Sequence, residues 1–183
     1  DRAACRAAVG QLDARHAAVL PLSPGLLPER HYIPALRLVL FGEGPELDAL
    51  ALLGNAAGLE VETHSKDGGG TLALGKAPSG VAVDRWTAII LLFHDHEWEQ
   101  AILEWALATP SFFIGAQGGR TARDERADRL RQAGVDPSEI ARVASPIGVV
   151  QHSREPMPLA LSILAAVVGD YEALHPHALL RSS

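Results

Sequence analysis

The sequence has too little of several features to support some common classes of protein. A single cysteine among 183 residues excludes an intrachain disulfide and a thiolate metal site within one chain. Lysine and arginine number 16 against 22 aspartate and glutamate residues, and the net charge of −6 argues against a nucleic-acid-binding surface. No apolar run is long enough to span a membrane and no signal peptide is visible, so we expect a cytoplasmic protein.

Instead, the sequence has strand patterns that alternate with helix patterns. Strands are predicted at residues 36–41, 59–63, 86–93 and 112–114. Helices are predicted at residues 45–57, 97–108, 120–132 and 158–174. Strands and helices that alternate in this way, joined by glycine turns, predict a parallel sheet with helices on both faces. The fold class is therefore α/β and Rossmann-like.

The two ends of the chain follow different patterns. Residues 1–20 are alanine-rich with helical spacing, and the proline-rich residues 21–34 are typical of a surface linker. We expect an N-terminal helical arm and linker at 1–34, a Rossmann domain at 35–175 and a C-terminal tail at 176–183. The helical pattern is already under way at Asp1 and there is no initiator methionine, so the sequence leaves open whether an upstream domain precedes it.

The turn Gly42-Glu43-Gly44, after the first strand, is one candidate site. Its glycines would let the backbone approach a phosphate, whose charge the start of the next helix would stabilise. Leu47 stands where the dinucleotide fingerprint has its third glycine, and Glu43 and Glu46 oppose a bound phosphate. The sequence supports a structural turn that binds no dinucleotide about as well as it supports a dinucleotide-binding site.

His94-Asp95-His96, after the most apolar strand, is a second candidate. Imidazoles and a carboxylate at the carboxyl edge of a sheet would bind a metal or move a proton. The alternative is that Asp95 or His96 caps the next helix, with Glu99 completing a capping box. We favour capping because two neighbouring histidines without a third ligand are a weak metal signal, and we assign no metal site.

A glycine loop between the fourth strand and the next helix is a third candidate. Gly115, Gly118 and Gly119, followed by Arg120, would form an anion cradle. The loop lacks the Walker lysine, which excludes a P-loop nucleotidase. The alternative is a flexible turn capped by Thr121. The two interpretations are equally supported for Arg120, whereas the arginines of residues 123–131 are expected on a solvated helix face.

The motifs of the second half occur together in an order that resembles one family. They are Phe113-Ile114-Gly115, Gly118-Gly119-Arg120, the segment 129–135, Ser145-Pro146-Ile147-Gly148 and the segment 160–165. Their order and spacing are similar to those of the C-terminal Rossmann domain of the XdhC/CoxI family, and segments 41–44 and 94–96 also fit. The resemblance covers most of residues 36–168.

The resemblance implies a function as well as a fold. Members of this family are maturation factors for molybdenum hydroxylases such as xanthine or carbon monoxide dehydrogenase. They bind molybdenum cofactor, protect it while its sulfido ligand is installed, and hand it to the apoenzyme. We therefore expect a cytoplasmic, non-catalytic factor with a molybdenum hydroxylase apoenzyme as partner and a phosphate-bearing small molecule as ligand. The expected cofactor contacts are Gly42, Gly44, His94, Asp95, His96, Gly115, Gly118, Gly119 and Arg120.

Two other functions remain open at this stage. An NAD(P)-dependent oxidoreductase would use His94 or His96 as its proton donor, although the second strand ends without the acid that holds a ribose. An interaction module that kept the fold and lost the ligand would form a homodimer through an exposed apolar face.

Overall fold

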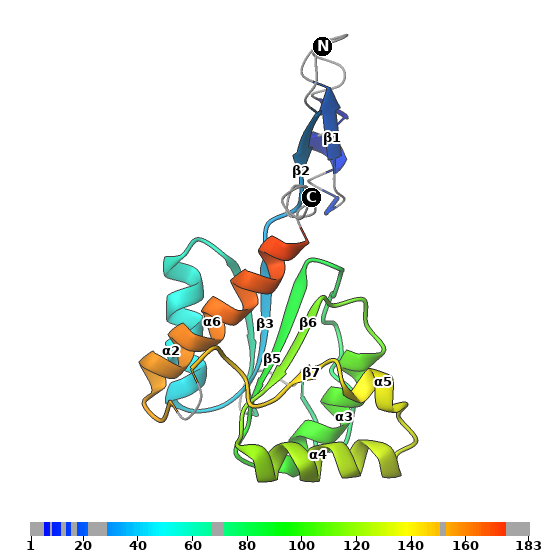
Figure 1. Ribbon diagram of the computed structural model, residues 1–183, viewed down its shortest axis with the longest axis vertical. Coiled ribbons are helices and arrows are strands. Elements are labelled where there is room, and N and C mark those ends of the chain that lie inside the picture. Colours follow the sequence, from blue (N-terminus) through cyan, green and yellow to red (C-terminus); the bar gives the residue numbers. More distant parts are fainter. Residues whose placement is uncertain are drawn as a thin grey trace, which may run out of the picture.

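The computed structural model describes residues 6–7, 9–11, 14–15, 18–21, 29–66, 72–150 and 153–174. Its centre is a five-stranded parallel sheet in the order β4-β3-β5-β6-β7. The strands are β3 (Arg37–Gly42), β4 (Glu60–His64), β5 (Thr87–Leu92), β6 (Phe113–Ala116) and β7 (Val143–Ala144). Helices α2 (Pro45–Ala56) and α6 (Pro156–Ala173) cover one face; α3 (His96–Leu107), α4 (Arg120–Gln132) and the short α5 (Pro137–Ile140) cover the other (Figure 1). The predicted α/β fold is confirmed.

The central strands separate two apolar cores. Leu38 and Leu40 of β3 belong to the core under α2 and α6, whereas Val39 and Phe41 belong to the core under α3 and α4. All six residues of β5 are buried. A strand covered on both faces needs no polar side, which is why residues 88–92 form an unbroken apolar run.

The predicted strands and helices of the Rossmann region agree with the structure to within two residues at their ends. Two short elements were not predicted, α5 and β7. A two-residue strand carries no periodicity, and it forms because β6 offers its edge to Val143 and Ala144. Within the described residues no helix is long and apolar enough to cross a membrane.

The prediction of a helix through residue 20 is wrong at its end. Residues 6–7 and 9–11 are helical, but β1 (Ala18–Pro21) is a strand that pairs antiparallel with β2 (Glu29–Tyr32), which lies in the predicted linker. A strand of this kind depends on a partner further along the chain, and local helical spacing does not reveal that partner. Residues 1–5 and 22–28, and the predicted tail at 176–183, lie outside the described residues.

Arg15 connects the N-terminal segment to the amino edge of the sheet. It makes ion pairs with Asp84 and, at 3.2 Å, with Glu60, and it donates to the carbonyl oxygen of Ala35 at 3.0 Å. The indole nitrogen of Trp86 donates to the carbonyl oxygen of Arg15 at 3.1 Å. Burial raises the pKa of Asp84, but hydrogen bonds from Arg15, Thr87 and the backbone of Trp86 outweigh burial and hold the pKa below its ordinary value of 3.8.

Candidate functional site

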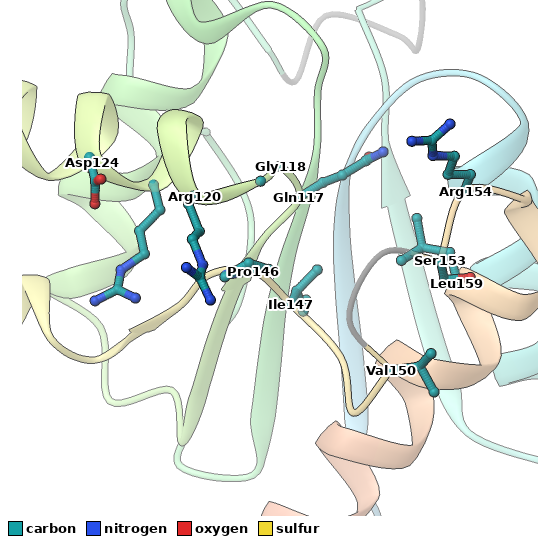
Figure 2. A pocket seen from close by; sticks show the side chains of 12 residues that line it. Gln117, Gly118, Arg120, Asp124, Pro146, Ile147, Val150, Ser153, Arg154 and Leu159 are labelled. Atoms are coloured by element: carbon teal, nitrogen blue, oxygen red, sulfur yellow. The ribbon is translucent and has the colours of Figure 1, made fainter.

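A cavity of about 630 Å³ opens at the carboxyl edge of the sheet. It lies between the β6–α4 loop, the first turn of α4 and the segment that leads from β7 into α6 (Figure 2). Open parallel sheets bind ligands at this edge. The lining residues are Gln117, Gly118, Gly119, Arg120, Arg123, Asp124, Pro146, Ile147, Val150, Ser153, Arg154 and Leu159.

The start of α4 presents uncapped backbone N–H groups to the cavity. Gly119 is the N-cap residue, no side chain caps the helix, and its first turn has no acidic residue. The first helical hydrogen bond of α4 runs from the amide of Arg123 to the carbonyl of Gly119, so the preceding N–H groups have no helical acceptor. Capping by Thr121, the predicted alternative, is therefore wrong. Gly118 has φ +126, a conformation that favours glycine.

Three arginines in the cavity wall lack acidic partners. Within the described part of the chain, no ion pair joins Arg120, Arg123 or Arg154 to a carboxylate, and Asp124 is the single carboxylate among the lining residues. Other arginines do form ion pairs, namely Arg15, Arg37, Arg126, Arg131 and Arg142. Guanidinium groups bind phosphate and carboxylate through paired N–H donors. The cavity therefore favours an anionic ligand.

Arg126 holds the two walls of the cavity together. Its guanidinium contacts the carboxylate of Glu99 at 3.1 and 3.2 Å, donates to the carbonyl oxygen of Gln117 at 2.8 Å and donates to Oγ of Ser145 at 2.8 Å. Arg126 is 3% exposed and Glu99 is 1% exposed. The prediction of a solvated face is thus wrong at Arg126. The Glu99 carboxylate binds Arg126 on α4, and its part in a capping box at the start of α3 stays a prediction.

The spacing of α4 contains a signal for the burial of Arg126. It lies four residues before Leu130, which is 1% exposed, and residues at that spacing share a helix face. An arginine on a buried face requires a charged partner, which marks it as part of an internal network rather than of the surface.

The segment after β7 is anchored to α6 by Ser162, a residue that sequence reasoning did not single out. The amide of Val150 donates to Oγ of Ser162 at 2.7 Å, and the amide of Val149 donates to its carbonyl oxygen at 3.3 Å. Gly148 has φ +100, and a Cβ there would lie 2.5 Å from the same hydroxyl. This packing places Val150 at the cavity.

Gly115 lies beneath the cavity rather than in its lining. It is the third residue of β6, and a Cβ there would lie 2.2 Å from Cδ1 of Ile147. The missing side chain lets Ile147 pack against the strand. Gly118, Gly119 and Arg120, by contrast, do line the cavity as the anion-cradle hypothesis expects.

The turn at Gly42 has a structural explanation of its own. A Cβ on Gly42 would lie 2.6 Å from the carbonyl oxygen of Leu92, so the neighbouring strand requires glycine there. Gly44, with φ +83, is the N-cap residue of α2. The Glu43 carboxylate lies 2.8 Å from Nζ of Lys66. This turn is close-packed and acidic, and its glycines do not line the cavity.

The histidine step after β5 also lies outside the cavity lining. Asp95 is the N-cap residue of α3, and its carboxylate accepts a hydrogen bond from the amide of Glu97 at 3.0 Å, so capping by Asp95 is confirmed. His96 is the first residue of α3. Nε2 of His94 lies 3.8 Å from the Glu46 carboxylate. No group of three potential metal ligands occurs among the residues that the structure describes.

Comparison with known proteins places these features in a wider context. The model of the XdhC Rossmann domain matches residues 38–167. The chain is 32% identical over 134 residues to the molybdenum cofactor insertion chaperone PaoD of Escherichia coli (strain K12), an alignment that covers 73% of this chain and 40% of PaoD. The crystal structure of a xanthine dehydrogenase from Bacillus halodurans matches with a TM-score of 0.61 and 21% identity, over 83% of this chain and 48% of that one. The chain thus spans about half or less of the length of these relatives.

Proposed function

The chain belongs to the XdhC Rossmann-domain family, and we propose that it is a maturation factor that holds molybdenum cofactor in the cavity between α4 and α6. The relative PaoD is a molybdenum cofactor insertion chaperone, which supports this class of function. The recipient of the cofactor would be the apoenzyme of a molybdenum hydroxylase, of the xanthine or carbon monoxide dehydrogenase type. No residue is assigned a catalytic role.

The convergence of Arg120, Arg123 and Arg154 on one cavity is the observation that carries this proposal. The cofactor has a phosphate group, and the donors at the start of α4 fit such a group: uncapped backbone N–H groups next to two guanidinium groups. When bound, the cofactor supplies the redox-active metal centre of the enzyme that receives it. The residues of this chain bind its phosphate and fix its orientation.

The walls of the cavity are fixed before any ligand arrives. Arg126 joins the Gln117 carbonyl on one wall to Ser145 at the start of the other, and Ser162 holds Val150 against α6. A site whose walls are already positioned loses less conformational entropy on binding. Such a site can retain a labile ligand until transfer.

Of the contacts predicted from the sequence, Gly118, Gly119 and Arg120 are kept in this proposal. Contact of the ligand with Gly42, Gly44, His94, Asp95 or His96 stays a prediction, since these residues lie at the neighbouring β3–β5 edge. Gly115 would contribute indirectly, because its lack of a side chain lets Ile147, a lining residue, pack against β6.

Anaerobic thermal unfolding with isolated molybdopterin tests the proposal. A ligand at 100 times its dissociation constant should stabilise the chain by about 2.7 kcal/mol. The double variant Arg120→Gln/Arg123→Gln should lose most of this stabilisation. Arg85→Gln is the matched control, because Arg85 stacks on Trp86 outside the cavity. Equal stabilisation of all three proteins, or no stabilisation of the wild type at 100 μM cofactor, would contradict the proposal.

The NAD(P)-dependent oxidoreductase is less well supported by the geometry. A Cβ on Gly42 would meet the carbonyl of Leu92, so packing against β5 explains that glycine without a pyrophosphate, and Leu47 stands where the dinucleotide fingerprint has its third glycine. Calorimetric titration with NADH and NADPH distinguishes the two functions. Binding of either dinucleotide in the micromolar range would favour the oxidoreductase.

Homodimer formation stays a prediction, and α6 offers a surface for it. Met157, Leu161 and Val168 are exposed on the outer side of that helix, at 46%, 61% and 38%. Sedimentation of the wild type and of Leu161→Glu measures whether they mediate association. A monomeric wild type would rule out this role.

A further inference from the structure

We propose that the cavity has two separate anion-binding ends, so that its ligand carries an anionic group at each end and an uncharged portion between them. This inference rests on the proposed function and specifies the class of ligand. It adds a second binding subsite, at Arg154, to the one at the start of α4.

The arginines approach the cavity from opposite sides. Arg120 and Arg123 belong to the first turn of α4, whereas Arg154 belongs to the segment that enters α6. Figure 2 shows Arg120 and Arg154 on opposite sides of Pro146 and Ile147. One compact anion would engage arginines gathered on a single side. This arrangement instead fits a ligand with charge at both ends.

The absence of acidic residues distinguishes the start of α4, one of the two helices beside the cavity, from the starts of α2 and α3. The first turns of α2 and α3 contain acidic side chains, which offset the partial positive charge of a helix start. The first turn of α4 contains none. The first turn of α6 also contains none, but its N-cap residue is Glu155, which follows Arg154 in the sequence. Arg120 occupies the first position of α4, where a cation is unfavourable for the helix itself. A ligand anion bound at the start of α4 would offset the unfavourable positive charge of Arg120 at that helix end.

The middle of the cavity has a different character. Pro146 and Ile147 lie between Arg120 and Arg154 in Figure 2, and together with Val150 and Leu159 they contribute apolar surface to the cavity. The side chain of Gln117 extends toward Arg154 (Figure 2), and its buried Oε1 has no hydrogen-bond donor among the described residues. A ligand N–H group would supply that donor. The uncharged portion of the ligand is therefore expected to be flat or apolar, with a polar N–H edge.

Inorganic phosphate is the probe that separates the two ends. In an amide NMR titration of the wild type, the signals of residues 118–121 and those of residues 153–154 should both shift. Arg154→Gln should weaken phosphate binding at residues 153–154 about tenfold or more and leave the other set unchanged. Arg120→Gln/Arg123→Gln should do the reverse. Arg85→Gln, which removes one positive charge outside the cavity as Arg154→Gln does inside it, should resemble the wild type.

The outcomes distinguish this inference from the proposed function. Shifts in only one set of signals, or loss of both sets in either variant, would overturn the two-ended cavity. Two phosphate sites in a protein that fails to bind molybdopterin would preserve the inference and contradict the proposed function. Molybdopterin that displaces phosphate from one end only would support the function and contradict the inference. The exposed arginines should be replaceable without unfolding, which circular dichroism verifies.

Discussion

Replacement of Arg126 by alanine should destabilise the fold by about 3–5 kcal/mol, the usual cost of leaving one member of a buried ion pair without its partner. The Glu99 carboxylate is 1% exposed, so it is shielded from bulk water where it meets the guanidinium. The variant also loses the hydrogen bonds to Ser145 and to the Gln117 carbonyl, each 2.8 Å long. The expected loss therefore lies toward the upper end of that range.

Urea unfolding at neutral pH, followed by circular dichroism, measures this loss. With a denaturant dependence of about 2 kcal/mol per molar urea, the midpoint should fall by about 2 M. The surface pair of Arg131 and Asp128 provides the control, because those side chains are 55% and 66% exposed. Arg131→Ala should change stability by no more than about 0.5 kcal/mol.

A double variant tests the physical reason for the loss. Glu99→Leu/Arg126→Met removes both charges and retains apolar volume, so it should be more stable than Arg126→Ala alone. The reasoning is refuted if Arg126→Ala costs less than about 1 kcal/mol, or if the double variant is as unstable as Arg126→Ala. The double variant should still bind phosphate more weakly than wild type, since the cavity walls lose their common anchor.

Three further predictions concern single positions. Gly148→Ala should cost about 1–3 kcal/mol in thermal unfolding, because φ is +100 and the added methyl would meet Oγ of Ser162; an unchanged melting temperature would contradict this packing. Asp84 has a lowered pKa in the folded state, so its stabilising effect is complete well above pH 3.8 and is lost as the pH falls through the lower folded value. Asp84→Asn should therefore flatten the acid limb of a stability–pH profile, and an unaltered slope would oppose this. Asp95→Ala should cost about 1 kcal/mol in urea unfolding through loss of the α3 cap, and no loss would show that its hydrogen bond to Glu97 is unimportant.

The fold could be predicted from the sequence because its main signals are local. The apolar run in β5 has no polar face, and a glycine or aspartate N-cap residue follows β3, β5 and β6. The strand β1 could not be predicted in this way, since it depends on pairing with β2. The division of the chain at residue 34 stays a prediction.

The candidate site was predicted in part. Gly118, Gly119 and Arg120 are adjacent in sequence, and their spacing before a helix indicates an anion cradle. Arg154 comes from a distant segment, and only the fold brings it to the same cavity. At Gly42 the pattern was ambiguous, because a glycine required by a neighbouring strand and a glycine that admits phosphate look alike in sequence.

The edges of the sheet restrict how this protein can associate with others. One edge strand, β7, has two residues, and the other, β4, carries Glu60 and Glu62. Short or charged edge strands discourage the addition of a strand from another chain. Growth of the sheet across molecules is thus disfavoured on both sides. Under the proposed function, a recipient enzyme would therefore dock on helices or loops, from which it could separate again after transfer.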